Sequence, residues 1–135
     1  MSDLPTLPAN ASDAQLISFV DSWVGLLSER RFADALAAIE AEPYWNAKLL
    51  AEIIDSYGEA ENNQVTLTNN GTAVDGAGKV SAFEQRKEVD WFDETRAEIW
   101  YDLNLNTIIS DLTATFTVTK TAAQLIIKLE DIHVM

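Results

Sequence analysis

The hydrophobic pattern of this chain changes its period close to Tyr57-Gly58. Before that point apolar residues recur at helical spacing, and after it they alternate with polar residues at strand spacing. A group of helices followed by a run of strands predicts an α+β domain, in which helices pack on one face of an antiparallel sheet. The pattern narrows the fold considerably and leaves the chemistry open.

Three helices are predicted before this change of period. The first opens at Ser12, because Ser12 and Gln15 have the spacing of a capping box. The second is expected over about residues 32–41, where a proline soon follows and prevents further helix. The third is expected over about residues 45–57, with Gly58 as its left-handed stop.

Strand-like alternation is clearest in two stretches of the second half. In one, Ile99, Tyr101 and Leu103 alternate with polar or large residues, and in the other threonines alternate with apolar residues. Short connections between such stretches favour antiparallel hairpins. We therefore predict two or three N-terminal helices packed on a curved antiparallel sheet of four to five strands, drawn from residues 64–68, 80–92, 97–103, 112–118 and 124–134.

Length and composition favour one domain. A chain of 135 residues, 47% of them hydrophobic, can bury a single substantial core. Residues 1–11 carry two prolines and no periodicity, so they are predicted to be a flexible arm before a domain at 12–135. The start shows no secretory signal and the chain has no cysteine, which together favour a cytoplasmic location.

The net charge of -13 limits the classes of partner. The acidity is spread along the chain, with a net of -8 over residues 1–61 and -5 over residues 62–135. Lys and Arg total only 9 and form no stripe, which argues against nucleic acid as a partner. The apolar stretches are too short to span a membrane. Solubility is the simplest reason for the charge, and attraction to a basic partner is the more specific one.

The order of the predicted elements resembles the NTF2-like superfamily of cone-shaped α+β domains, which are related in shape to cystatins. The resemblance depends on a tryptophan-bearing first helix, a short second helix, a third helix ending at Tyr57-Gly58, and a run of long strands. The stretches 99–103, 110–114 and 129–135 are also similar to small uncharacterised bacterial proteins. The resemblance implies a homodimer formed through the outer sheet face. It implies no single activity, since the superfamily includes isomerases, dehydratases and binding subunits.

An acid–base enzyme of the isomerase type would need a carboxylate in an apolar pocket and a nearby hydrogen-bond donor. The candidate carboxylates are Asp90 and Asp102, with Tyr57 or Tyr101 as the donor. Both carboxylates alternate with the apolar residues of their stretches. If the apolar residues face the helices, the carboxylates lie on a solvated outer face, and a bulge of one residue would reverse this assignment.

His133 is the only histidine, and it shares the parity of Leu129 and Asp131 on the last predicted strand. Asp131 or Glu130 would orient it if it acted as a general base. A single histidine so close to the chain end is more often structural. With no cysteine and only scattered acids, the sequence predicts neither a metal site nor a cofactor.

The outer face of the predicted sheet offers a different kind of site. An acidic stripe with an aromatic ring would be formed by Glu98, Trp100 and Asp102. Thr115 would add a polar surface if its strand is adjacent. Tryptophan is enriched among residues that anchor protein interfaces, so this stripe is the predicted binding surface.

Two functions remain, and we favour the first. It is a non-enzymatic module that binds another protein or itself, of which an inhibitor or immunity-type protein is one form. Its support is the negative charge, the outward parity of Trp100 and the lack of an evident catalytic set. The alternative is an enzyme or small-ligand binder whose pocket in the cone interior is lined by Trp23, Tyr57, Tyr101 and Phe116.

Overall fold

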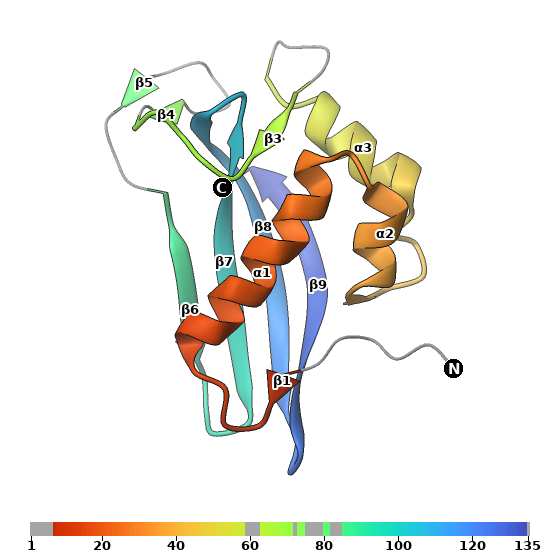
Figure 1. Ribbon diagram of the computed structural model, residues 1–135, viewed down its shortest axis with the longest axis vertical. Coiled ribbons are helices and arrows are strands. Elements are labelled where there is room, and N and C mark those ends of the chain that lie inside the picture. Colours follow the sequence, from red (N-terminus) through yellow and green to blue (C-terminus); the bar gives the residue numbers. More distant parts are fainter. Residues whose placement is uncertain (1–6, 59–62, 72, 75–79, 82–84, 135) are drawn as a thin grey trace.

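The computed structural model describes residues 7–58, 63–71, 73–74, 80–81 and 85–134. Three helices pack against one face of a strongly curled antiparallel sheet, which has the form of a half-barrel (Figure 1). The helices are α1 (Asp13–Ser28), α2 (Phe32–Ala37) and α3 (Ala47–Asp55). The strands are β1 (Leu7–Pro8), β2 (Glu40–Ala41), β3 (Val65–Thr66), β4 (Ala73–Val74), β5 (Val80–Ser81), β6 (Lys87–Trp91), β7 (Arg96–Leu105), β8 (Ile108–Lys120) and β9 (Gln124–Val134).

Helix α1 begins where the sequence predicts. The Gln15 amide donates to Ser12 Oγ at 3.2 Å, and the Ser12 amide donates to Gln15 Oε1 at 2.8 Å. This reciprocal pair is a capping box, which satisfies two of the amide groups that the start of a helix leaves without partners. Its buried stripe, which includes Trp23, faces the sheet. The predicted first helix is therefore confirmed.

The other two helices are shorter than predicted. Helix α2 ends at Ala37, and the next residues extend as β2, which pairs parallel to β9 with Glu40 opposite Lys128. The prediction of helix to residue 41 is wrong because pairing with the edge of β9 satisfies backbone groups there. Helix α3 starts after Asn46, whose side chain accepts from the Leu49 amide at 2.8 Å. Beyond it, Gly58 has the left-handed φ of 67° that the sequence predicts.

The four longest strands, β6 to β9, form consecutive antiparallel pairs. Short strands extend this sheet: β1 and β2 pair with the edge of β9, and β3 pairs with β7. The single long strand expected over residues 80–92 is two strands, β5 and β6, and residues 82–84 between them lie outside the described residues. At the described end of the predicted arm, Leu7 lies opposite Leu125 in the β1–β9 pair.

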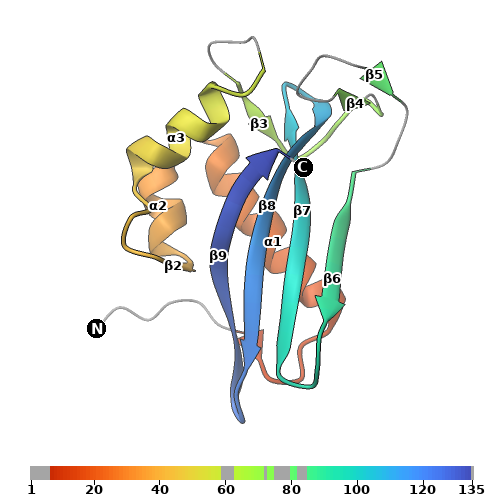
Figure 2. The same cartoon turned by 180° about the vertical axis from the view of Figure 1, so that it is seen from behind.

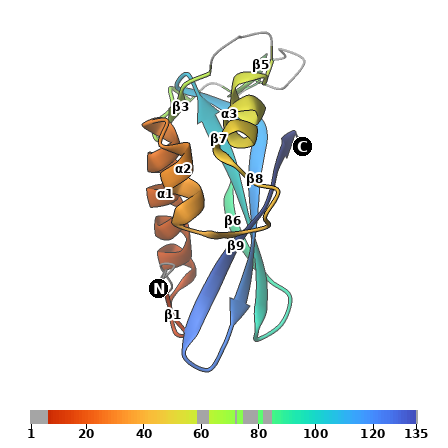
Figure 3. The same cartoon turned by 90° about the vertical axis from the view of Figure 1, so that its right-hand side faces the viewer.

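The concave, helix-facing side of the sheet carries the core. Ile99, Tyr101 and Phe116 are no more than 1% exposed and belong to one cluster with the buried stripe of α1. The Trp23 ring meets the Phe116 ring edge-on at 5.3 Å between centroids, and Trp23 Nε1 donates to the Ala35 carbonyl at 2.9 Å. The predicted orientation, with the apolar residues of β7 under the helices, is confirmed. The helices lie to one side of the sheet in Figure 3.

Polar contacts fix α1 over β6 and β7. Asp21 accepts hydrogen bonds from the Tyr101 hydroxyl and from Lys87 Nζ, the latter at 2.9 Å. Asp13 accepts from Trp91 Nε1 at 2.8 Å. Burial, followed by the hydrogen bond to Asp21, raises the pKa of Tyr101 well above its usual range, so this hydroxyl stays a donor.

This arrangement is compatible with the cone-shaped NTF2-like fold. Among the described residues, no helix combines the length and the apolar character needed to cross a membrane.

Candidate functional site

The outer face of the sheet is the side that no described helix crosses. In Figure 2 this face lies in front of the helices, with β9, β8, β7 and β6 side by side. The strand register sets its rows: Trp100 lies opposite Glu88 on one side and Thr115 on the other, and the next row joins Asp102 to Thr113. The threonine strand is therefore adjacent to the strand that carries Glu98, Trp100 and Asp102.

Asp102 lies on this outer face but is not solvated. It is 6% exposed, and its carboxylate accepts hydrogen bonds from Thr113 Oγ1 at 2.8 Å and from the Arg86 amide at 3.0 Å. The Arg86 guanidinium lies 3.5 Å from the same carboxylate. The expectation of a solvated carboxylate is wrong, because the longer side chain of Arg86 covers it. These contacts connect β7 to β8 and to the segment before β6. The role of Asp102 is therefore structural.

Trp100 is half-buried, and a cation covers part of its ring. The Arg86 guanidinium carbon lies 5.0 Å from the ring centroid, within the range of a cation–π contact. Thr115, directly opposite Trp100 in the register, is 1% exposed. Part of the Trp100 side chain is therefore exposed on this face, whereas Thr115 and Asp102 are too deeply buried to form a binding surface.

An acidic group extends the outer face toward the β6–β7 hairpin. Asp90 lies directly opposite Glu98 in the β6–β7 pair, and Glu98 is close enough to Asp90 and to Glu130 for its charge to interact with theirs. Burial raises the pKa of Glu98, and the charges of Glu130 and Asp90 raise it further. Asp90 and Glu130 are exposed and Glu98 is half-buried. Glu98 thus has two like charges near it on the face that no described helix crosses, and we call Asp90, Glu98 and Glu130 the acidic group.

A β-bulge decides the placement of Glu130 and His133. The β8–β9 register pairs Phe116 with Leu129 and then Thr115 with Asp131, which leaves Glu130 as the extra residue. Leu129 therefore faces the core, whereas Asp131 and His133 lie on the outer face. The expectation that His133 shares a face with Leu129 is wrong for this reason. A sequence signal exists, because the apolar residues of the strand change parity between Leu129 and Ile132.

His133 is paired with a carboxylate, as the sequence suggested. Its Nδ1 lies 3.1 Å from Asp131 Oδ2, and the two side chains are 43% and 53% exposed. The other proposed acid–base groups do not join it. Asp90 is on the hairpin side of the outer face, and Asp102 is held by Thr113 and Arg86.

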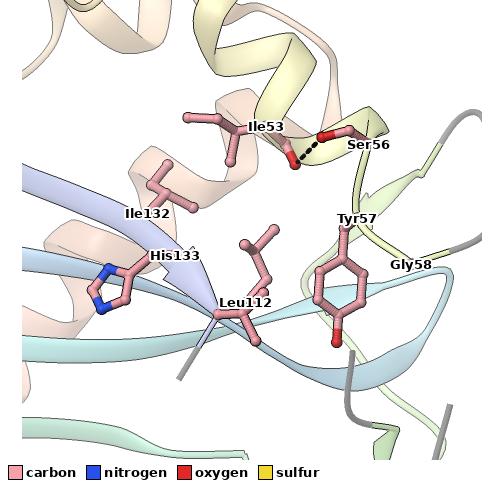
Figure 4. Close-up of a pocket in the computed structure, with 8 residues that line it drawn as sticks. Ile53, Ser56, Tyr57, Gly58, Leu112, Ile132 and His133 are labelled. Carbon is pink, nitrogen blue, oxygen red and sulfur yellow. Dashed lines mark hydrogen bonds between the residues drawn. The ribbon is translucent and has the colours of Figure 1, made fainter. Parts of the chain in front are cut away.

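Tyr57 and His133 border one pocket at the end of the sheet near α3 (Figure 4). Its volume is about 300 Å³. In Figure 4 the two rings lie on opposite sides of the pocket, with Leu112 between them. The Tyr57 hydroxyl donates to Asp111, a contact that the sequence analysis did not anticipate. The two side chains do not form an acid–base pair, because neither ring points toward the other.

The residues predicted to line a pocket in the cone interior do not lie together around the pocket near α3. Of these four residues, Tyr57 borders the pocket near α3. The other three, Trp23, Tyr101 and Phe116, are 2%, 1% and 0% exposed and are packed in the core. Their packing shows that the aromatic residues of α1, β7 and β8 stabilise the fold.

No metal site is found in the part of the chain that the structure describes, where no group of three or more His, Asp or Glu side chains could hold an ion. Comparison with known proteins gave no match to a family model, to a curated protein or to a solved structure.

Proposed function

We propose that this chain is a non-enzymatic, cytoplasmic protein-interaction module of the NTF2-like superfamily, which binds a basic surface of another protein through its outer sheet face. The observation that carries the proposal is the acidic group beside the half-buried Trp100. A strongly acidic chain attracts basic partners at long range, and a local group of like charges determines where such a partner docks.

The raised pKa of Glu98 supports this reading. Burial and the like charges of Glu130 and Asp90 disfavour the ionised carboxylate in the isolated protein. A partner that places lysine or arginine side chains against the group would relieve this repulsion. Trp100 would supply an aromatic surface next to the charges, a combination typical of interface anchors.

The same charges argue against the homodimer as the main assembly. Two copies joined face to face would bring two acidic groups toward each other, and like charges across an interface weaken association. A basic partner is therefore the better fit. An inhibitor of a basic toxin is one form of this function, and it would be recognised by loss of the toxin's activity on mixing.

The test compares two triple variants with equal changes of charge. The first neutralises the acidic group, with Asp90→Asn, Glu98→Gln and Glu130→Gln. The control neutralises three exposed acids of the helical side, with Glu29→Gln, Asp34→Asn and Glu52→Gln. Tagged wild-type and variant chains are used to capture proteins from a lysate, and a protein lost only with the first variant is purified.

Binding of that purified protein is then measured at low and high salt. We expect the outer-face variant to bind at least about tenfold more weakly than the control, with the larger part of the loss in the association rate. Equal binding by the two variants would contradict the proposal. A homodimer at low salt that the outer-face variant disrupts would contradict the choice of partner and favour self-association.

A further inference from the structure

The pocket near α3 is distinct from both the core and the acidic group. It lies where α3 ends, against Leu112 in the first part of β8 and the last residues of β9 (Figure 4). The apolar part of its wall is formed by Ile53, Leu112, Ile132 and Val134. Val134 is 51% exposed, so a large apolar side chain at the rim is left in contact with water. A ligand with an apolar body would cover this surface, and burial of the surface away from water would contribute favourable binding free energy.

The polar groups of the pocket indicate the charge of such a ligand. Tyr57 borders the pocket and donates its hydroxyl hydrogen to Asp111, and His133 borders it and contacts Asp131 at 3.1 Å. One carboxylate, that of Asp111, is therefore hydrogen-bonded to a lining side chain, and a second, that of Asp131, contacts another. The residues that line the pocket include neither lysine nor arginine, and the chain carries a net charge of -13. This surrounding field disfavours anions and favours cations.

We propose that this pocket binds a small amine with an apolar aromatic or branched aliphatic body. The apolar body lies against Ile53, Leu112 and Ile132. The ammonium group lies on the Tyr57 side, where the carboxylate of Asp111 attracts it. The proposal is independent of the outer-face function, because it uses none of the residues of the acidic group.

The first experiment compares three compounds that share one body and differ in charge: 2-phenylethylamine, 2-phenylethanol and 3-phenylpropanoate. Each is titrated into the protein while the methyl signals of Ile53, Leu112, Ile132 and Val134 are followed by NMR. For ligands of this size we expect dissociation constants on the order of a millimolar. The amine should bind most tightly and the carboxylate most weakly. Failure of all three to shift these methyl signals, or tighter binding of the carboxylate, would overturn the proposal.

Variants then locate the site. Ile53→Trp fills the pocket, and its control, Leu49→Trp, changes a half-buried residue one turn earlier on α3 that does not line it. We expect at least about a tenfold loss of amine binding for the first and little change for the second. If Ile53→Trp does not fold, Ser56→Phe narrows the same pocket from an exposed position. Folded filling variants that bind the amine like the wild type would show that the site is wrong.

Replacing Asp111 by Asn tests the chemical class. The substitution keeps the shape and removes the charge, so binding of the alcohol should persist while the advantage of the amine over the alcohol disappears. An undiminished advantage of the amine would mean that Asp111 does not select the ligand.

Discussion

The two faces of the β7–β8 part of the sheet hold their side chains in different ways. On the inner face, Tyr101 and Phe116 are buried because helix α1 covers them, and Trp23 of that helix packs edge-on against Phe116. On the outer face, Asp102 is buried because neighbouring side chains of the sheet itself cover it. Burial therefore has two origins here, because helices cover one face and side chains of neighbouring strands cover parts of the other. The outer face carries a half-buried aromatic ring and the acidic group on the side that no described helix crosses.

The largest loss of stability is expected from removing a large aromatic side chain that packs on the inner face. Trp23→Ala should lower the free energy of unfolding by about 3–5 kcal/mol, because it leaves a cavity beside Phe116 and removes the donor to the Ala35 carbonyl. Trp100→Ala, its outer-face counterpart, should cost about 1 kcal/mol, since it loses mainly the contact with Arg86. Urea unfolding of the two variants measures the difference. Similar losses would show that the outer face is as essential to stability as the core.

Asp102 and Asp90 both lie on the outer face, but only Asp102 is buried. Asp102→Ala should lower the free energy of unfolding by about 2–3 kcal/mol, because the Thr113 hydroxyl, the Arg86 amide and the Arg86 guanidinium all lose their acceptor. Asp90→Ala, one strand away and exposed, should change it by less than about 0.5 kcal/mol. Chemical denaturation again gives both values. If both substitutions change the free energy of unfolding by a similarly small amount, the contacts of Asp102 with Thr113 and Arg86 do not stabilise the fold.

The inner face should also control stability at alkaline pH. The pKa of Tyr101 is raised in the folded protein, so the folded state keeps a proton that the unfolded chain loses above about pH 10. Stability should therefore fall as pH rises beyond that value, by up to about 1.4 kcal/mol per pH unit for this group. Unfolding curves across alkaline pH measure the slope. The free energy of unfolding of the Tyr101→Phe variant should fall less steeply with pH than that of the wild type. An unchanged slope would exclude this tyrosine as the cause.

Much of the inner face could be predicted from the sequence because its determinants are local or periodic. The alternation of Ile99, Tyr101 and Leu103 marks the side that the helices cover, and the Ser12–Gln15 capping box marks the start of α1. Strand β2 could not be predicted in the same way. It depends on pairing with β9, and β9 lies far away along the chain.

The outer face was harder to predict because its burial depends on which long side chain covers which short one. Nothing local to Asp102 shows that Arg86 and Thr113 enclose it. The bulge at Glu130 is a partial exception. The apolar residues change parity between Leu129 and Ile132, which signals an inserted residue and would have placed His133 on the outer face.

The smallest expected change in the free energy of unfolding is that of a variant at Glu98 in the acidic group. This variant distinguishes a role in stability from a role in binding. The folded-state pKa of Glu98 is raised above its value in the unfolded chain, so its ionised form opposes folding at neutral pH. Glu98→Gln should therefore raise the free energy of unfolding slightly at neutral pH, by less than about 0.5 kcal/mol. The gain should vanish as pH falls below about 4, where the unfolded carboxylate is also protonated. Thermal unfolding at two pH values measures it. A variant that is stabilised and binds its basic partner more weakly would show that the charge is kept for recognition, whereas a destabilised variant would mean that Glu98 supports the fold.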